Sequence, residues 1–319
     1  TGSNHAIATV NGTSALHVAL KLAGVNKDDQ VITQSLNFVA SINAIYYCNA
    51  TPLFIDVSKE SLGICPESLS LFLESNCELR DDGYCWNKKS NRLIRVCIPM
   101  HTFGLPSDMD RIKSICDQFN IVIVEDAAES LGSFYKDSHT GTIGKLGILS
   151  FNGNKIITTG GGGMIITDDE ETALAAKHLT TTAKVVNGNI WEHDQIGFNY
   201  RLPNINAALG LAQLERIQEL IDSKRFISNT YKNWFKNTNI RYVSEQNNTK
   251  SNYWLNTILL DDKETRDIFL RETNENDIQT RGAWKPMHQL SFVDNRDIQD
   301  LSNTEWLYDR LINVPSGVI

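Results

Sequence analysis

Lys155 is the residue around which a reaction could be built. It lies in the stretch SFNGNKIITTGGGGM, residues 150–164, between an Asn-rich turn and a run of glycines. A lysine directly after a strand offers a nucleophilic amine, and glycines beside it let the backbone approach a ligand closely. Most lysines are surface charges, so Lys155 needs partners before it indicates a site.

A phosphate site is indicated by NGTSALHVAL, in which Gly12, Thr13 and Ser14 fall between a strand and a helix. The N–H groups of a helix N-terminus and the two hydroxyls suit a phosphate group. The alternative is a plain N-cap, which is the commoner meaning of this pattern. The stretch has neither the GK[ST] ending of a Walker A loop nor the GxGxxG pattern of a dinucleotide site.

Asp126 follows the apolar run IVIVE and is therefore expected at the ligand edge of a sheet. A carboxylate buried there needs a cation or hydrogen-bond donors, because an unpaired buried charge is costly. A cap of the next turn is the alternative. Together with Lys155 and the phosphate site, Asp126 matches pyridoxal phosphate, which needs an amine, an acid at its ring nitrogen and a phosphate anchor. The pattern predicts this cofactor, with Lys155 as the base for proton transfer.

Alternating apolar and amphipathic segments must position these residues. Strands are expected at 30–35, 51–57, 93–100, 121–127, 147–152 and 163–169. Helices are expected at 14–24, 38–49, 66–76, 108–119 and 170–179. The strands 93–100 and 121–127 are apolar nearly throughout, which is typical of a sheet covered on both faces. The pattern therefore predicts an α/β fold with a mostly parallel central sheet flanked by helices.

The second half of the chain begins with a helix expected over 205–237, long enough to link two lobes. Further elements are expected as a strand at 252–260 and helices at 263–275 and 304–313. These elements predict a smaller C-terminal α+β domain. We therefore divide the chain into a large domain, residues 1–216, and a smaller domain, residues 217–319.

Two further features concern the borders of these elements. The segment 77–92 is polar and rich in turn residues, so it is expected to form an exposed excursion from the sheet. The chain opens close to a strand and stops at NVPSGVI without a terminal helix. Both ends are therefore expected to be incomplete.

The composition excludes several classes of protein. The 319 residues are 41% hydrophobic, which is enough for a sizeable core. A net charge of -8 without a basic cluster argues against a nucleic-acid partner. No run approaches the roughly 18 apolar residues of a membrane span, and no leader sequence is visible, so a cytoplasmic protein without a membrane partner is expected. The six cysteines include no CxxC pair, so we expect reduced thiols and no metal site.

A family resemblance runs over essentially the whole chain. Its motifs are NGTSALHVAL, NFVAS, VEDAAESLGS, SFNGNKIITTGGGGM and GFNYRLPNINAALGLAQLE, in this order. The set closely resembles the DegT/DnrJ/EryC1/StrS family of sugar-nucleotide aminotransferases. The resemblance implies the fold type I architecture of pyridoxal phosphate enzymes, this cofactor, and a homodimer with shared active sites.

The resemblance also assigns roles at the cofactor. Lys155 would form its Schiff base, and Asp126 would pair with its pyridine nitrogen. Thr13, Ser14 and Ser150 would hold its phosphate.

Three further cofactor contacts follow from the same resemblance. Phe38 would stack on the ring. Glu129 would lie near the ring hydroxyl, where several relatives carry glutamine, so a carboxylate is a departure from the family pattern. Asn199 would reach the phosphate bound by the neighbouring subunit, which makes the active site a property of the dimer.

A finer resemblance is carried by CWNKKSNRLIRVCIPMHTFG, AESLGSFYKDSHTGTIG, HLTTTAKV and SNYWLN. It implies transfer of an amino group from L-glutamate to carbon 4 of a nucleotide-linked 4-keto-6-deoxy-N-acetylhexosamine. UDP is the nucleotide that this resemblance favours. Such sugars lead to legionaminic acid or bacillosamine. Candidates for the substrate pocket are Arg201, Trp284 and His288, with Trp191, His193 and Lys285 as further polar residues. Partly buried packing is the alternative for the Trp and His side chains.

Other functions compete with this interpretation. A sugar 3-aminotransferase or a sugar dehydratase of the same fold is the nearest alternative. Relatives that act as dehydratases carry histidine in place of the lysine, so Lys155 favours transamination. A regulator or scaffold that only binds the cofactor is the non-enzyme alternative, but no basic helix-turn-helix pattern is visible. The sequence does not distinguish UDP from GDP.

Overall fold

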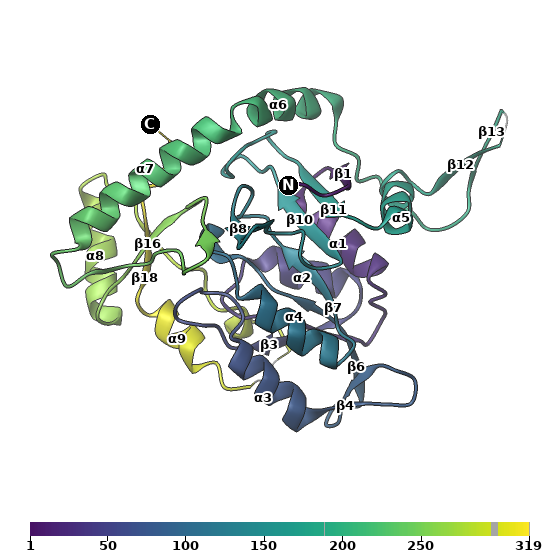
Figure 1. Cartoon of the computed structure of the whole chain (residues 1–319), viewed down its shortest axis with the longest axis horizontal. Helices are drawn as coiled ribbons and strands as arrows, with labels where there is room; N and C mark the ends of the chain where they lie inside the picture. The colour runs from purple at the N-terminus through teal and green to yellow at the C-terminus, as the bar shows by residue number, and fades with distance from the viewer. Residues whose placement is uncertain (188, 295–298, 319) are drawn as a thin grey trace.

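A central sheet, mostly parallel, organises the chain (Figure 1). The computed structural model describes residues 1–187, 189–294 and 299–318. In spatial order the strands are β1 (His5–Thr9), β11 (Gly163–Thr167), β10 (Leu146–Ser150), β7 (Val122–Asp126), β6 (Arg92–Ile98), β2 (Gln30–Gln34) and β3 (Thr51–Ile55). Neighbours from β10 to β3 are parallel, whereas β11 runs antiparallel to β10 and β1. The fold class expected from the sequence is confirmed.

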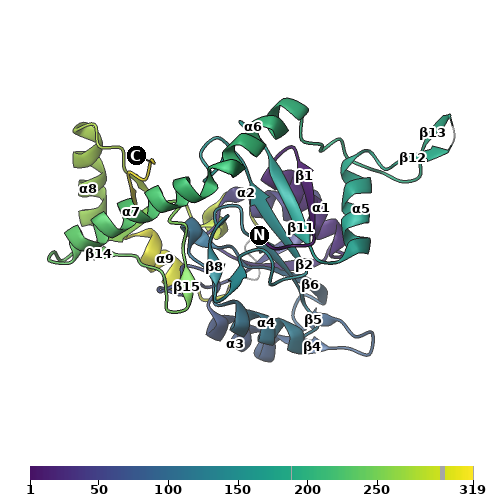
Figure 2. The same ribbon diagram turned by 45° about the horizontal axis from the view of Figure 1, so that its top comes forward.

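Helices cover both faces of this sheet, which explains its continuous apolar strands. One face carries α1 (Gly12–Leu22), α2 (Val39–Tyr47) and α5 (Glu170–Thr180). The other face carries α3 (Pro66–Asn76) and α4 (Met109–Gln118). Figure 2 shows α3 and α4 together, away from α1 and α5. Each predicted helix of this part of the chain is present, with ends that differ by a few residues.

The segment 77–92, expected to be an exposed excursion, forms a hairpin that joins the sheet. Its strands β4 (Cys77–Leu79) and β5 (Cys85–Asn87) pair with each other, and β5 also pairs with β6. Most of the segment is exposed, as expected, but it does not leave the sheet, because Cys77 and Cys85 bury their side chains in the core and β5 pairs with β6. Alternating burial of this kind is typical of a strand, whatever the mean polarity.

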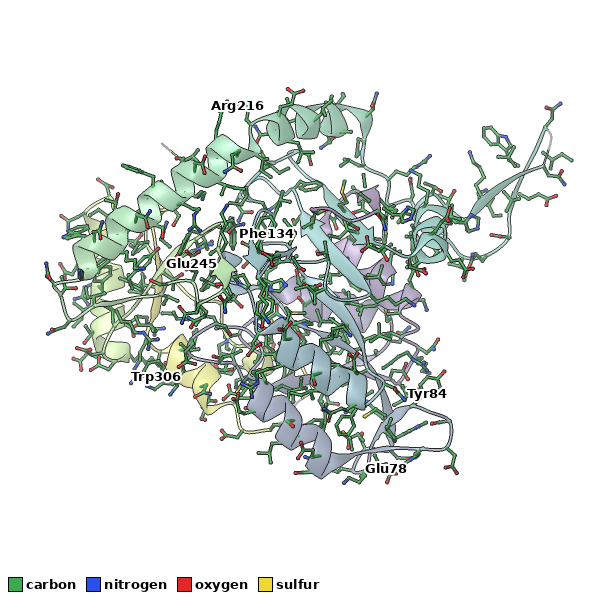
Figure 3. All side chains as sticks on the ribbon, viewed as in Figure 1. Glu78, Tyr84, Phe134, Arg216, Glu245 and Trp306 are labelled. Atoms are coloured by element: carbon green, nitrogen blue, oxygen red, sulfur yellow. The ribbon has the colours of Figure 1, made fainter. Side chains whose placement is uncertain are left out.

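The single helix expected over 205–237 is two helices. α6 (Asn204–Glu215) and α7 (Ile217–Phe235) meet at Arg216, whose backbone leaves the helical region at φ -108° and ψ 8° (Figure 3). No proline or glycine stands at the break, so the sequence carries no signal for it. The break separates an α6 with mostly exposed side chains from an α7 that packs on the C-terminal lobe. It coincides with the predicted domain boundary after residue 216, which stays a prediction.

The C-terminal lobe is a small antiparallel sheet with helices beside it. Its strands, in order, are β14 (Arg241–Tyr242), β16 (Asn256–Leu259), β18 (Leu311–Val314) and β17 (Arg281–Gly282). Its helices are α8 (Lys263–Glu275) and α9 (Ser302–Tyr308). The helix expected over 304–313 is wrong beyond Tyr308, because Leu311, Ile312 and Val314 are buried and pair with β16 instead. The strand expected over 252–260 is confined to β16.

Short elements complete the described chain. A small sheet of β8 (Phe134–Tyr135), β9 (Ser138–His139) and β15 (Thr249–Lys250) connects the two lobes. The hairpin of β12 (Lys184–Asn187) and β13 (Ile190–His193) projects from the body beyond α5 (Figure 1). Single 3₁₀ turns are η1 (Thr102–Gly104) and η2 (Met287–Gln289). Within the described residues, no helix combines the length and apolar character of a membrane span.

Candidate active site

The residues predicted from strand ends meet at one edge of the sheet. β1, β10, β7 and β2 run in the same direction, so their carboxyl ends lie together. Gly12 opens the helix after β1, Ser150 ends β10 and Asp126 ends β7. Phe38 follows β2 as the residue before α2. Ligands bind at this edge in parallel α/β sheets, so its side chains form the candidate site.

The first turn of α1 lies against the end of β10. A Cβ at Gly12 would stand 3.1 Å from the Cβ of Ser150, so any other residue here would force the two elements apart by a few tenths of an ångström. Asn11 caps the helix, since its Oδ1 accepts a hydrogen bond of 2.7 Å from the backbone N–H of Ser14. The capping role that was the alternative for Thr13 and Ser14 is thus held by Asn11. Hydroxyls and a helix N-terminus converge here, as a phosphate requires.

Asp126 is buried and held by neutral donors. Ser41 donates its hydroxyl to Oδ2 at 2.7 Å, and the backbone N–H of Ala128 donates to Oδ1 at 3.2 Å. The Asp126 main chain bonds Pro99 and His101 of the neighbouring β6 segment. A buried carboxylate without a cation among these donors is suited to accept a further N–H from a cationic ring.

Lys155 lies between a carboxylate and an aromatic ring. Its Nζ is 3.2 Å from Oε1 of Glu129 and 3.9 Å from the centroid of the Trp254 ring. Trp254 is buried and donates its indole N–H to the carbonyl of Asn154 at 2.6 Å. The indole therefore fixes both the backbone before Lys155 and the direction of its amine. Sequence reasoning missed Trp254, although it stands in the motif SNYWLN.

Glu129 accepts its second hydrogen bond from a residue with an unusual backbone conformation, Phe103. The N–H of Phe103 donates to Oε2 at 2.9 Å, and Phe103 has a φ of 58°, in the left-handed region. A bulky residue rarely adopts this conformation, and such strain is concentrated at functional sites. Burial raises the pKa of Glu129, against the opposing effects of the Lys155 charge and the Phe103 N–H.

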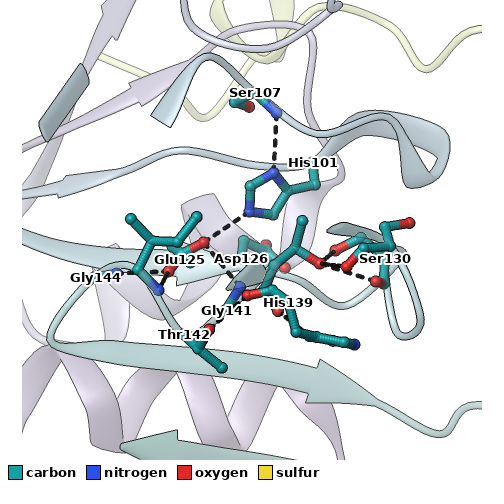
Figure 4. Close-up of polar contacts among 12 residues, drawn as sticks. His101, Ser107, Glu125, Asp126, Ser130, His139, Gly141, Thr142 and Gly144 are labelled. Carbon is teal, nitrogen blue, oxygen red and sulfur yellow. Dashed lines mark hydrogen bonds and ion pairs between the residues drawn. The ribbon is translucent and has the colours of Figure 1, made fainter. Parts of the chain in front are cut away.

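A second buried carboxylate, Glu125, supports the strand that carries Asp126 (Figure 4). Its oxygens accept backbone N–H groups from Gly141, Ile143 and Gly144 at 2.6–2.8 Å. His101 donates from Nε2 at 3.0 Å, because its Nδ1 accepts the N–H of Ser107. Burial opposes ionisation, but these donors outweigh it and lower the pKa of Glu125.

The predicted substrate residues occupy different environments. Trp284 packs its ring 4.9 Å from that of Phe103 and 5.9 Å from that of Phe38, at the site. His288 is buried, with Nδ1 2.7 Å from the Ser35 hydroxyl and Nε2 3.3 Å from Glu305. Lys285 follows Trp284 in the chain. Their roles toward a substrate stay predictions.

Asn199 and Arg201 lie outside this cluster. Both are exposed, and the Arg201 guanidinium donates to the Asn199 amide oxygen at 3.3 Å. The Arg201 backbone pairs with Thr9, so the segment runs beside the start of α1. Trp191 and His193 are on the projecting hairpin, where Trp191 is 71% exposed. The described chain thus does not bring these residues to Lys155.

The clustered residues fit pyridoxal phosphate. An amine, a buried carboxylate and a phosphate cradle lie along one sheet edge, with Lys155, Asp126 and Ser150 as their side chains. Phe38 is 46% exposed and is available for stacking on a ligand. Each group that the cofactor requires is therefore supplied by this chain.

Comparisons with known proteins agree with this fit. The model of the DegT/DnrJ/EryC1/StrS aminotransferase family matches residues 1–318. EpsN of Bacillus subtilis, named as a pyridoxal phosphate-dependent aminotransferase, is 37% identical over 321 residues, which cover 99% of this chain and 80% of EpsN. The GDP-perosamine synthase of Vibrio cholerae is 32% identical over 317 residues, 98% of this chain and 81% of that enzyme.

A solved structure extends the match to three dimensions. The DegT DnrJ EryC1 StrS aminotransferase of Brucella abortus superposes with a TM-score of 0.88 at 25% identity, covering 99% of this chain and 82% of that chain. The family, enzyme class and cofactor predicted from the sequence are confirmed. The chain belongs to the DegT/DnrJ/EryC1/StrS aminotransferase family, a family of sugar aminotransferases that use pyridoxal phosphate.

Proposed function

We propose that the chain transfers the amino group of L-glutamate to carbon 4 of a nucleotide-linked 4-keto-6-deoxy-N-acetylhexosamine, with UDP as the nucleotide. The observation that supports a transaminase is the position of Lys155. Its amine is 3.2 Å from Glu129, at the sheet edge that also holds Asp126. The keto sugar and its use for legionaminic acid or bacillosamine rest on the motifs CWNKKSNRLIRVCIPMHTFG and SNYWLN. The name of one relative, GDP-perosamine synthase, refers to a GDP-linked sugar, so GDP is the competing nucleotide.

Each residue of the site has a task in this reaction. When bound, pyridoxal phosphate supplies an electron sink for removal of a proton from the amine-bearing carbon. Lys155 binds the cofactor and moves that proton at Nζ. Asp126 holds a proton on the ring nitrogen, because its carboxylate favours the cationic ring.

The remaining residues bind and orient. Thr13, Ser14 and Ser150 hold the phosphate at the start of α1. Phe38 stacks on the ring, and Trp284 packs beside it and limits the access of water.

The first half of the reaction can be tested by visible absorbance. Protein with added pyridoxal phosphate should show a band that Lys155→Ala lacks and that L-glutamate converts, with release of 2-oxoglutarate. The exposed Lys145 provides a matched control, since Lys145→Ala should behave as the wild type. A band that glutamate leaves unchanged would favour the dehydratase, and no Lys155-dependent band would refute the assignment.

The second half identifies the sugar. UDP-linked and GDP-linked 4-keto sugars, and a 3-keto sugar, are each offered to the glutamate-treated enzyme, and the product is analysed by mass spectrometry and NMR. Amination at carbon 4 of the UDP sugar is expected. Amination at carbon 3 would assign the chain to the 3-aminotransferases instead.

We also propose a homodimer that completes the site. α6 exposes Ile205, Leu209, Leu211 and Leu214, and the adjoining segment exposes Trp191 and Ile196. Apolar side chains gathered on neighbouring segments indicate a protein interface. Asn199 and Arg201 lie in the same stretch of chain and would face the partner's cofactor.

Leu211→Glu should therefore convert the dimer to a monomer and remove activity together, because a charge would be buried in the interface. Light scattering coupled to size-exclusion chromatography, with 2-oxoglutarate release from the same fractions, measures both. Leu71→Glu, at an exposed leucine of α3, is the matched control. An active monomer would contradict the shared site.

A further inference from the structure

Glu129 belongs to a buried group of two carboxylates and one amine. Its side chain is 2% exposed, and Asp126 is also buried. The Lys155 ammonium is the cation that faces Glu129, at 3.2 Å, and Asp126 is the negative group whose charge acts on it. Asp126 has its own donors in Ser41 and Ala128, whereas Glu129 depends on Lys155 for charge compensation.

The position of Glu129 is fixed from several elements. Asn252, before β16, donates its side-chain N–H to the Glu129 carbonyl at 2.9 Å. Phe103 of η1 gives the backbone N–H to Oε2, which leaves Oε1 directed at Lys155. A carboxylate oxygen held at hydrogen-bond distance from an amine can take its proton.

Lys155 can attack a carbonyl only as a neutral amine with a free lone pair. The transfer Lys155–NH₃⁺ plus Glu129–COO⁻ to Lys155–NH₂ plus Glu129–COOH breaks an N–H bond, forms an O–H bond and needs no other reactant. It also removes two opposite charges from a buried site, where each is costly. Burial, which raises the pKa of Glu129, favours the same direction.

We propose that Glu129 is the catalytic base that takes a proton from the Lys155 ammonium and keeps it while the amine is engaged by the cofactor. This inference rests on the proposed function in that Lys155 binds pyridoxal phosphate. Glu129 then works as a neutral acid, in the protonation state that a glutamine at this position would imitate. A glutamine would keep the hydrogen bond from Phe103 but could not accept the proton.

Proton release on cofactor binding tests the transfer. Pyridoxal phosphate is added to wild type, Glu129→Gln and the control Glu171→Gln in weak buffer with a pH-indicator dye, while visible absorbance counts bound cofactor. In the wild type and the control, Glu129 keeps the proton that Lys155 loses. In Glu129→Gln that proton has no acceptor and leaves to solvent, so this variant should release about one proton more per bound cofactor. Equal release at equal binding would overturn the proposal.

A cofactor-free measurement separates this inference from the proposed function. Lys155→Met removes the ammonium, so Glu129 should carry a proton and give the carbonyl infrared band of a carboxylic acid near neutral pH. The double variant Lys155→Met with Glu129→Gln should lack that band. Its absence from Lys155→Met would refute the role of Glu129, even if the wild type binds cofactor and reacts with glutamate.

Discussion

Glu125 lies in β7, Glu129 follows the end of that strand, and both are buried, yet their surroundings shift their pKa values in opposite directions. Glu125 accepts three backbone N–H groups and the His101 ring, and its pKa is lowered. Glu129 accepts one backbone N–H and the Lys155 amine, and its pKa is raised. The number of fixed donors therefore decides the direction of the pKa shift, because the burial of the two side chains is nearly equal.

The difference separates a structural carboxylate from a reactive one. Three of the four donors of Glu125 are parts of the backbone and the fourth is the buried His101 ring, so fixed groups compensate its charge and it ties the 141–144 loop to β7 (Figure 4). The main partner of Glu129 is a side chain that the reaction itself uses. A carboxylate with a partner of this kind can change its protonation during turnover.

The largest effect is expected from Lys155→Ala, which removes the partner of Glu129 and leaves the Glu125 cluster intact. Release of 2-oxoglutarate from glutamate should fall by about 10⁴-fold, the upper range for loss of a proton-transfer group. Circular dichroism should show an unchanged fold. Activity within tenfold of the wild type would contradict the role of Lys155.

Glu125→Gln should destabilise the protein without directly touching the reacting groups. The amide NH₂ of the introduced glutamine is a donor, and it would face backbone N–H groups that are also donors. These buried N–H groups would lose their acceptor, at a cost of about 3 kcal/mol in the free energy of unfolding. Urea unfolding measures this loss. Glu129→Gln is the matched variant and should lose less, because its amide oxygen still accepts the Phe103 N–H. Equal losses would remove the distinction between the two carboxylates.

His139, which ends β9 just before the 141–144 loop, should make this part of the protein acid-sensitive. Burial lowers the pKa of His139 from 6.5 to about 4, while its Nε2 accepts the N–H of Gly132. The folded state therefore binds fewer protons than the unfolded state between these values. Stability should fall on acidification through this window, by about 3 kcal/mol in total. His139→Gln should remove this component from the pH dependence of urea unfolding.

The smallest expected effect is that of Glu129→Gln on the pH dependence of stability. Because burial raises the pKa of Glu129, the folded state holds a proton more tightly than the unfolded chain. Wild-type stability should then decline as pH rises above the ordinary glutamate pKa of 4.5, and this component should be absent from Glu129→Gln. Thermal unfolding of cofactor-free protein at stepped pH measures it, and identical profiles would count against a raised pKa.

Much of the site could be predicted because it lies at strand ends. Asp126 and Ser150 each end an apolar strand, and Gly12 begins the helix after another, so parallel pairing alone brings them to one edge. Trp254 could not be placed in this way. It reaches Lys155 from the C-terminal lobe, and no periodicity of the sequence relates segments so far apart.

The same limit explains the errors in the fold. A helical pattern over 205–237 gives no reason for a break at Arg216, which arises where α6 leaves the surface that α7 packs against. The residues after Tyr308 have a helical sequence pattern, but in the structure they form a strand that pairs with β16. Local propensity was overridden by tertiary packing in the first case and by strand pairing in the second.

The sequence by itself determined the α/β fold and the cofactor, and it predicted Lys155 and Asp126 as site residues, because strand periodicity and residue chemistry are local properties. Only the tertiary structure decided how Glu125 and Glu129 differ. Their donors come from η1, from the 141–144 loop and from Lys155, which are separate in the chain. A buried charge is set by the groups that fold around it, and these are known only once the chain has folded.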